Sequence, residues 1–418
     1  MKKCLVILVV VVLLFSTCSN LSYAGEIDVL LDLLVEKKVL TSEEAQNVKA
    51  ETERKVAKQM VEEKPEVPSW VQKLKLTGDV RVRYQYEKKD GSAARNRGRL
   101  RYRLGMLANI NKQWTLGAGL ASGSNDPRST NQSFTDAFAT PDIRMDYAYA
   151  KYLPFVWMEI VAGKFQFTDY LWQQGDLLWD SDINPEGGSV TFKKSVKLGN
   201  VGTDLFFNTG TWILDEASGD VSDPFMVYLQ PGSIFQFSDV IALKTAVAYY
   251  NFVNVKGAVI DHSSGTNTTE SNGALAHDYD VINPVVELGF KSPFGKDHFL
   301  QYFAFFGGFA SNLDEGADNT SDNDGWQAGV KLGYSKLKSP GDWQVKYQYS
   351  MLGKDAFPDS FPDSDRYNGA TDIKGHEIAL EYMLMENVIA GIDYYRDKRD
   401  RATESEQDLI QGDLSLKF

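Results

Sequence analysis

The fold of this chain follows from Asp408-Leu409-Ile410-Gln411-Gly412-Asp413-Leu414-Ser415-Leu416-Lys417-Phe418, its final residues. From Asp408 onward, every second residue belongs to a mostly apolar set, and the residues between are mostly polar. Successive side chains of a strand point to opposite faces, so this alternation gives the strand one apolar and one polar face. A two-faced strand that ends on an aromatic residue is typical of a strand between lipid and water.

The same alternation recurs along most of the chain, in segments of about ten residues separated by turn residues, as in outer-membrane β-barrels. A single-chain barrel with both ends in the periplasm requires an even number of strands. We therefore predict an all-β transmembrane protein, a 16-stranded antiparallel outer-membrane β-barrel over residues 73–418, wide enough to hold water. The predicted strands are 74–86, 97–108, 114–122, 142–152, 156–165, 189–196, 202–213, 225–236, 240–252, 280–291, 299–310, 326–337, 343–352, 373–384, 387–396 and 406–418.

The connections between these segments are of two kinds. Short turns, such as Leu153-Pro154-Phe155, alternate with long loops rich in Gly, Asn, Asp and Ser at 123–140, 253–279, 311–325 and 353–372. Bacterial barrels have short periplasmic turns and long external loops. We therefore expect the long loops to lie outside the cell, and the turns and both chain ends to lie in the periplasm.

Residues 1–24 have the features of a secretory signal peptide. Two lysines precede an apolar run at 4–15, and Ser22-Tyr23-Ala24 provides a small-residue cleavage site. Both cysteines of the sequence fall inside this signal, so the mature chain has no disulfide available to it. The formal charge of −13 becomes −15 once the two lysines are removed, which argues against a nucleic-acid partner.

Residues 25–72 differ from the rest and predict a short periplasmic helical segment. Residues 27–34 have the pattern of a short amphipathic helix, and Thr41-Ser42-Glu43-Glu44 is a capping box that opens a second helix to about Glu63. The second helix has a thin apolar stripe and many charges. It is either a solvated spacer or a weak coiled coil.

A group of arginines is the first candidate functional feature. On the polar faces of the first two predicted strands lie Arg81, Arg83, Arg99, Arg101 and Arg103, with Arg144 on the fourth. On the lipid face each would cost about 2–4 kcal/mol near the midplane, so the alternation places them inside. In a water-filled barrel they would attract anions. The alternative is that they pair with inward acids such as Asp79 and Asp146 and serve structure alone.

The loop at about 166–188 is the second candidate feature, because it combines acids with Trp172 and Trp179. It is too aromatic for a solvated surface loop and could fold into the lumen. Its carboxylates would then lie across from the arginines and create a transverse field that sorts solutes by charge. The acids concerned are Asp176, Asp180, Asp182 and Glu186.

Several runs resemble the putative porin family of Gram-negative outer membranes: Asp146-Tyr147-Ala148-Tyr149-Ala150-Lys151-Tyr152, Gly163-Lys164-Phe165, Trp179-Asp180-Ser181-Asp182-Ile183-Asn184-Pro185-Glu186-Gly187, Phe361-Pro362-Asp363-Ser364-Asp365 and the leader 34–41. The resemblance covers essentially the whole mature chain. It implies a general porin in which the third external loop bends into the pore opposite a basic cluster. In this chain, that pore would lie between the five arginines of the first two strands and Asp176, Asp180 and Asp182.

Other functions have less support in the sequence. The four histidines are scattered and accompany no nucleophile pattern, so we predict no catalytic site, and no metal site or cofactor. The acidic run at 314–325 lacks the ligand spacing of an EF-hand. An outer-membrane anchor or adhesion protein, which would use the N-terminal helices and external loops, is the alternative function.

The predicted partners follow from the barrel. They are outer-membrane lipid and lipopolysaccharide, small hydrophilic solutes, and the barrel-assembly machinery through the C-terminal strand ending at Phe418. The sequence does not choose between a homotrimer and a monomer, or between a general and an anion-selective channel.

Overall fold

The computed structural model describes residues 34–35, 37, 39–48, 50–51, 73–216, 222–314, 316, 322–401 and 405–418. The chain divides into two compact units, Met1–Gln72 and Lys73–Phe418. Within the described residues, no helix has the length and apolar character needed to cross a membrane. The predicted signal peptide lies outside the described residues.

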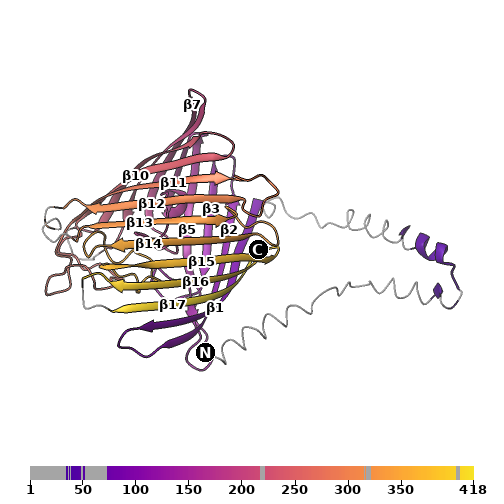
Figure 1. The fold of residues 1–418 in the computed structure, drawn as a ribbon, viewed down its shortest axis with the longest axis horizontal. Coiled ribbons are helices and arrows are strands. Elements are labelled where there is room, and N and C mark those ends of the chain that lie inside the picture. Colours follow the sequence, from indigo (N-terminus) through magenta and orange to yellow (C-terminus); the bar gives the residue numbers. More distant parts are fainter. Residues whose placement is uncertain are drawn as a thin grey trace. The chain divides into compact units, whose positions relative to one another are not determined.

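The second unit is a closed antiparallel barrel (Figure 1). Each long strand pairs with the next along the chain, and β1 pairs with both β2 and β17, which closes the sheet. The strands of the described residues are β1 (Leu74–Lys89), β2 (Arg95–Asn109), β3 (Trp114–Ala121), β4 (Gln132–Ser133), β5 (Arg144–Phe155), β6 (Met158–Lys164), β7 (Glu186–Leu198), β8 (Val201–Ile213), β9 (Phe225–Gln236), β10 (Ile241–Val253), β11 (Tyr279–Lys291), β12 (Tyr302–Asn312), β13 (Asp324–Gly333), β14 (Trp343–Leu352), β15 (Ile373–Met385), β16 (Val388–Arg399) and β17 (Glu406–Lys417).

The predicted 16-stranded barrel is confirmed. The short β4 is an addition that sequence reasoning missed: it belongs to the loop between β3 and β5 and pairs with β2 at Arg99 and Leu100. The other strands of the described chain form the barrel wall, and most lie within a few residues of their predicted positions. A two-residue strand is too short to produce a detectable alternation.

The turn predicted at Leu153-Pro154-Phe155 is wrong. These residues continue β5, and the chain turns at 156–157 instead. The register of β5 against β6 is irregular between Tyr152 and Phe155. Proline has no N–H to donate to a ladder, so a strand can hold it at such an irregularity.

Alternation along the closing strands determines which side chains face the interior. On β1, Val82 is 47% exposed on the outer face, whereas the neighbouring Arg83 is 4% exposed. Val82 pairs with Leu414 and Arg83 with Asp413 across the β1–β17 seam. The register therefore sets apolar pairs outside and a charged pair inside, as the C-terminal alternation predicted.

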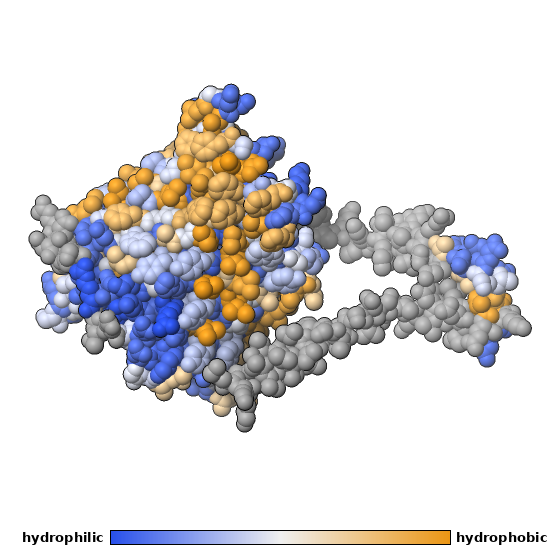
Figure 2. Space-filling view, in the orientation of Figure 1, coloured by the Kyte–Doolittle hydropathy of each residue, from blue (hydrophilic) through white to orange (hydrophobic). Residues whose placement is uncertain are grey.

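The outer surface shows the result of this alternation. Hydrophobic residues form a broad area over the upper and central part of the face drawn in Figure 2, and hydrophilic residues gather toward its lower left. Large apolar side chains on the outer face include Leu116, Leu205, Val247, Leu380 and Ile410, each more than a third exposed. An apolar outer surface of this extent matches a lipid surround.

The barrel interior is partly filled by loops. The third loop (residues 165–185) places Trp179 against Trp212 of β8 and against Phe357 of the seventh loop (residues 353–372), each with ring centroids 5.3 Å apart. Residues of the fifth loop (254–278) join the same buried apolar cluster, Val255 among them. The long loops 253–279 and 353–372, expected as external loops, therefore fold back onto the interior.

These two polar loops can be buried because they satisfy one another's hydrogen bonds. The Asp359 carboxylate accepts hydrogen bonds from the Ser263 hydroxyl at 2.7 Å and from the Thr266 and Asn267 amides. Asp355 likewise accepts from the Thr268 amide at 2.8 Å. A buried polar group costs little once it has its partners. The Gly-, Asn-, Asp- and Ser-rich composition predicted external loops, and it could not reveal this mutual pairing.

In the first unit, residues 42–48 are helical. The Thr41 amide donates to Glu44 Oε2 at 2.8 Å, and the Glu44 amide donates to Thr41 Oγ1 at 3.3 Å. This is the reciprocal pattern of a capping box, at the residues where the sequence predicted one. The first predicted helix, 27–34, lies almost wholly outside the described residues, and the periplasmic placement of this unit stays a prediction.

Candidate functional site

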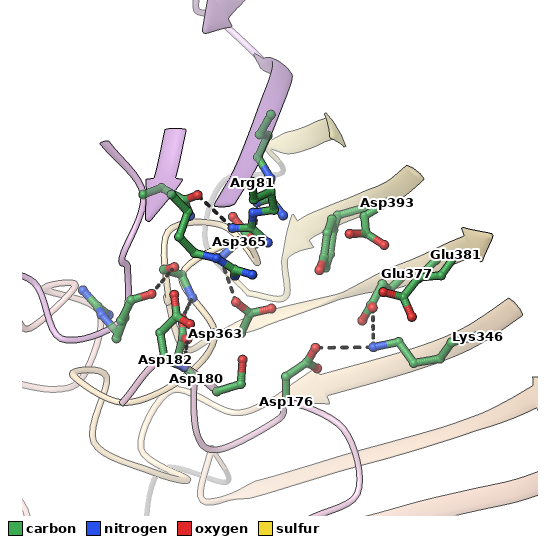
Figure 3. Close-up of a pocket in the computed structure, with 18 of the residues that line it drawn as sticks. Arg81, Asp176, Asp180, Asp182, Lys346, Asp363, Asp365, Glu377, Glu381 and Asp393 are labelled. Carbon is green, nitrogen blue, oxygen red and sulfur yellow. Dashed lines mark hydrogen bonds and ion pairs between the residues drawn. The ribbon is translucent and has the colours of Figure 1, made fainter. Parts of the chain in front are cut away.

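A cavity of about 310 Å³ lies inside the barrel and is lined by charged side chains (Figure 3). One side is formed by arginines of β1 and β2, and the other by residues of β14, β15 and β16. The third and seventh loops complete the lining. The labelled side chains that converge on it are Arg81, Asp176, Asp180, Asp182, Lys346, Asp363, Asp365, Glu377, Glu381 and Asp393.

The β1–β2 hairpin brings the predicted arginines together. Arg81 pairs in register with Arg101, and Arg83 with Arg99. Asp79 pairs with Arg103 at the next inward position. Like charges directly opposite each other on a sheet are destabilising, so this group, here called the arginine wall (Arg81, Arg83, Arg99, Arg101 and Arg103), requires acidic partners.

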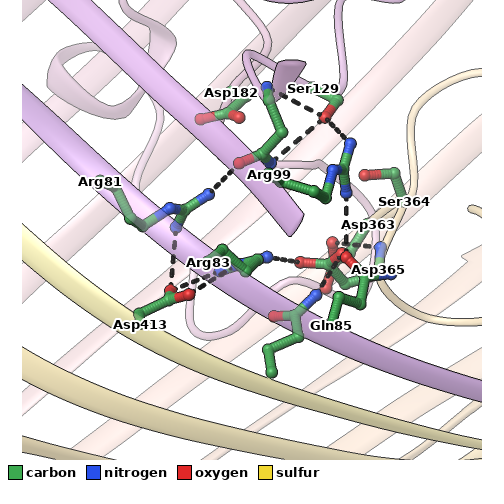
Figure 4. Close-up of polar contacts among 12 residues, drawn as sticks. Arg81, Arg83, Gln85, Arg99, Ser129, Asp182, Asp363, Ser364, Asp365 and Asp413 are labelled. Atoms are coloured by element: carbon green, nitrogen blue, oxygen red, sulfur yellow. Dashed lines mark hydrogen bonds and ion pairs between the residues drawn. The ribbon is translucent and has the colours of Figure 1, made fainter. Parts of the chain in front are cut away.

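Asp79 and Asp413 supply much of that compensation. Asp79 holds Arg101 through Nε–Oδ2 at 2.8 Å and Arg103 through Nε–Oδ1 at 2.7 Å. Asp413 of β17 accepts two hydrogen bonds of 2.7 Å from Arg83, a bidentate pair (Figure 4). Asp146 forms no ion pair in the described part of the chain; it accepts a hydrogen bond from Asn184 instead. Asp79 therefore pairs with the arginines, as the structural alternative predicted, whereas Asp146 does not.

Two arginines of the wall are less compensated. Arg99 donates to Gln85 Oε1 at 3.0 Å and to Ser129 Oγ at 3.4 Å, and within the described residues it has no carboxylate within 4.0 Å. Arg81 donates to Asn131 Oδ1 at 2.8 Å and lies 3.4 Å from Asp413. Figure 4 shows both, Arg81 with its contact to Asp413 and Arg99 with its contact to Ser129.

The third loop carries three of the predicted acids to the cavity. They do not all lie opposite the arginines, because one of them contacts the arginine wall. Asp182 contacts the arginine wall directly, with Arg103 Nη1 at 3.4 Å. Asp180 accepts hydrogen bonds from the Asp182 and Ser364 amides, both at 2.9 Å. Asp176 lies 3.6 Å from Lys346 of β14. The loop therefore spans the cavity from one wall to the other.

A glycine allows the loop to make this crossing. Gly175 has φ +80°, in the left-handed region, and a Cβ there would lie 2.6 Å from Gln327 Oε1 and 3.0 Å from Gln348 Oε1. Gln348 in turn donates to Asp176 at 2.6 Å. Only glycine combines this backbone conformation with so close an approach to the wall.

Burial and neighbouring charges divide the loop acids into two kinds. Burial, together with Asp182, raises the pKa of Asp180 well above its ordinary value of 3.8. Burial and the carboxylates of Asp176 and Asp180 raise the pKa of Asp363 in the same way. For Asp182, burial is outweighed by Arg103 and Arg101, which lower the pKa. Asp180 and Asp363 therefore bind a proton more readily than an ordinary aspartate does.

The far wall adds a second set of buried ion pairs that sequence reasoning missed. Lys346 forms an ion pair with Glu377 of β15. Arg366 of the seventh loop contacts Asp397 of β16 at 2.7 Å, and both side chains are almost fully buried. Glu377 and Asp413 occupy inward positions of the strand alternation, which could have identified them. The run Phe361-Pro362-Asp363-Ser364-Asp365 has no strand alternation, and only its resemblance to the family singles it out.

Two predicted residues lie elsewhere. Glu186 is the first residue of β7 and not part of the loop; its exposed carboxylate pairs with Lys164 at 2.8 Å. Arg144 begins β5 and is not among the residues that line the cavity. Arg99 and Arg103 do not line the cavity, but they lie beside residues that do.

The cavity is lined by five basic and eight acidic side chains. Three of the basic residues belong to the arginine wall, and the acids lie on the third and seventh loops and on β15 and β16 (Figure 3). The charges are only partly separated, because Asp182 and Asp365 contact the arginine wall and Lys346 lies among the acids of the far wall. In the described residues, no group of three or more His, Cys, Asp or Glu side chains could hold a metal ion. The arrangement can order water and orient charged or dipolar solutes.

Comparison with known proteins gives a family and a fold. A family model described as "Putative porin" matches residues 87–289 and 294–418. A structure of Pseudomonas putida OprB aligns with a TM-score of 0.52 and 11% identity, covering 83% of this chain and 95% of that chain. A mutant of the Rhodopseudomonas blastica porin aligns with a TM-score of 0.41 and 13% identity, covering 82% and 100%. A search of functionally curated proteins gives no significant match.

Proposed function

Because this chain belongs to the porin family described as "Putative porin", and is an outer-membrane β-barrel of that family, we propose that it forms a water-filled channel for passive diffusion of small hydrophilic solutes and ions. The observation that carries the proposal is the charged cavity inside a closed barrel with an apolar outer surface. A stable soluble protein keeps most charged groups on its outside, whereas this unit exposes large apolar side chains on its outer face and encloses charged ones around the cavity. Family and fold both favour a channel without enzymatic activity.

We infer that the cavity sorts solutes by a transverse field. The arginine wall and the carboxylates of β15 and β16 lie on different sides of the same space, and the loop acids lie between them. A dipolar solute can align with such a field, whereas an apolar solute must displace ordered water to pass. Proton uptake by Asp180 and Asp363 would weaken the acidic side at low pH.

Anion preference, the finer prediction from the sequence, is the second candidate. Arg99 favours it, because within the described residues its charge has no carboxylate partner. The eight lining acids oppose it, because they outnumber the five lining bases. The sign of the selectivity therefore depends on how many of these acids are charged at the working pH.

Planar-bilayer conductance of the refolded mature chain tests both the proposed channel and its ion selectivity. We expect stable channels that conduct in simple salt solution, and an absence of conductance would overturn the proposed function. In a salt gradient, the variant Arg81→Gln with Arg99→Gln should move the reversal potential toward cations. Asp393→Asn should move it toward anions.

The matched control is Arg95→Gln, which removes an exposed arginine at the end of β2 outside the cavity. It should leave the reversal potential unchanged. If the control and the Arg81 and Arg99 variant shift the potential equally, the arginine wall does not set selectivity, although the channel itself would stand.

The remaining partners are also proposals. Both chain ends and the short turns would lie in the periplasm, with Phe418 available to the assembly machinery. The Phe418 amide and carbonyl both bond Gly78 of β1, which ties the terminal residue to the seam. Contacts with lipopolysaccharide, and with neighbouring copies in a homotrimer, would involve the outer surface.

A further inference from the structure

A second cavity, of about 410 Å³, lies between the third loop and the walls of β7, β8, β9 and β10. It differs in character from the first, because its lining combines lysines with aromatic and aliphatic side chains: Trp172, Lys193, Phe206, Ile234 and Lys244. Its volume lies within the range of small-molecule sites, about 300–1,000 Å³. The proposed channel function makes no use of it.

The aromatic part of this cavity is held in place by buried amides. Gln230, which is 0% exposed, accepts a hydrogen bond from the Trp172 amide at 2.8 Å and donates to the Trp172 carbonyl at 2.7 Å. Asn208 donates to the same Gln230 oxygen at 3.0 Å. Trp172 is thus fixed by both of its backbone groups, which is the kind of support that preorganises a binding site.

The basic part of the cavity is centred on Lys244. Its Nζ lies 4.2 Å from the Trp172 ring centroid and 5.6 Å from that of Phe206. No carboxylate of the described residues lies within 4.0 Å of it, whereas Lys331, farther along the wall, is paired with Glu287 at 3.0 Å. A desolvated ammonium over aromatic faces retains its capacity to bind an anion.

Other charged residues also belong to the lining. Lys193 contributes from the inward face of β7, in register with Phe206, and the acids are Asp169 and Asp204. Asp204 accepts a hydrogen bond from Ser195 Oγ at 2.5 Å. Two lysines of the inward face thus share the cavity with two aspartates, and Lys244 lies over the aromatic rings.

We propose that this cavity is a solute-binding subsite for small carboxylates that carry an aromatic ring. The carboxylate would pair with Lys244, with Lys193 nearby in the lining, and the ring would contact Phe206, Ile234 and Trp172. This inference rests on the proposed channel function, because the solute would reach the subsite through the lumen. An anion without a ring would lack the apolar contacts, and an uncharged aromatic compound would lack the ion pair with the Lys244 ammonium.

The test uses the full mature chain, refolded in detergent, with 4-fluorobenzoate as the probe and ¹⁹F line broadening as the readout. We expect saturable binding of 4-fluorobenzoate. Acetate and the neutral 4-fluorobenzyl alcohol should occupy the cavity to the same extent only at roughly tenfold higher concentration or more. Lys244→Gln should weaken binding by about tenfold, since a hydrogen bond to a charged group is lost. Phe206→Leu should weaken the binding of 4-fluorobenzoate by a larger factor than it weakens the binding of acetate, which is measured by competition with the probe.

Lys291→Gln is the matched control, because Lys291 is exposed at the end of β11 and lies outside the cavity. It should bind the probe as the wild type does. Equal affinity in the Lys244→Gln and wild-type proteins would overturn the inference, as would equally tight binding of the neutral alcohol. Displacement of the probe by glucose at equal concentration would assign the cavity to sugars and also overturn it.

Salt conductance of the same preparations separates the two proposals. Conductance without probe binding would remove the subsite and leave the channel. Probe binding without conductance would remove the channel and leave a binding cavity. Heat-induced unfolding of Lys244→Gln and Phe206→Leu shows whether either variant has lost its fold; if one has, the other decides the outcome.

Discussion

At the scale of single residues, Arg83 shows how a guanidinium can be kept inside this barrel. It is 4% exposed and is held by the bidentate pair with Asp413 and by Asp365 at 3.2 Å. Removing one partner of a buried ion pair leaves the other uncompensated, which costs about 3–5 kcal/mol. We expect Arg83→Met to lower the stability of the barrel by that amount, measured by denaturant unfolding followed by circular dichroism.

The double variant Arg83→Met with Asp413→Leu is the internal comparison. Because it removes both charges of the bidentate pair, it should recover part of the loss, since apolar replacement of a whole buried pair is often close to neutral. The loss that remains measures the contacts of Arg83 with Asp365 and of Arg81 with Asp413. Unfolding of Arg83→Met at the wild-type denaturant concentration would show that the pair contributes nothing to stability.

The raised pKa of Asp363 leads to a pH dependence of defined sign. An acid whose pKa is higher in the folded than in the unfolded protein binds protons more strongly when folded, so stability falls as pH rises from the ordinary value of 3.8 through the raised value. Asparagine is neutral throughout. We expect Asp363→Asn to be more heat-stable than the wild type at pH 8, with the difference vanishing below pH 3.8.

Melting temperatures at a series of pH values measure this effect. Asp142→Asn, a change at an exposed loop residue, serves as the control and should show no such pH-dependent gain. A loss of stability in Asp363→Asn at pH 8 would mean that the carboxylate is needed in its charged form.

At the scale of elements, the third loop depends on one aromatic anchor. Trp179 is 2% exposed and packs against Trp212 of the wall and Phe357 of the seventh loop. Replacing a buried tryptophan by alanine costs about 3–5 kcal/mol. We expect Trp179→Ala to release the third loop from the wall and to raise single-channel conductance, measured in planar bilayers.

Trp157→Ala is the matched change for comparison, because Trp157 is 47% exposed on a short turn. It should leave single-channel conductance as in the wild type. If Trp179→Ala conducts like the wild type while remaining folded, the third loop does not limit the pore.

At the scale of the whole molecule, the two compact units allow the channel to be separated from the alternative function. All residues that line either cavity belong to the unit Lys73–Phe418. We expect deletion of residues 25–72 to leave channel conductance unchanged within a factor of about two, and an anchor or adhesion protein to lose its attachment. Conductance is measured in bilayers, and attachment by release of the protein from isolated cell envelopes.

The same deletion can contradict the channel assignment. Loss of conductance in a deleted chain that still forms the barrel, judged by heat-modifiable gel mobility, would show that the first unit takes part in conduction. The closed seam between β1 and β17 does not require that unit, because the pairing begins at Asp79.

The sequence by itself determined the barrel, its strand number and the inward face that carries the arginines. It could do so because alternation is a local property: each side chain's face is set by its position along its own strand. The tertiary structure alone decided which charges meet. Asp413 reaches Arg83 only because the last strand closes on the first, and the seventh loop reaches Arg128, whose Nη1 donates to the Asp359 carbonyl, only by folding inward. Ion pairing and loop burial depend on contacts between residues far apart in the chain, and no local pattern encodes them.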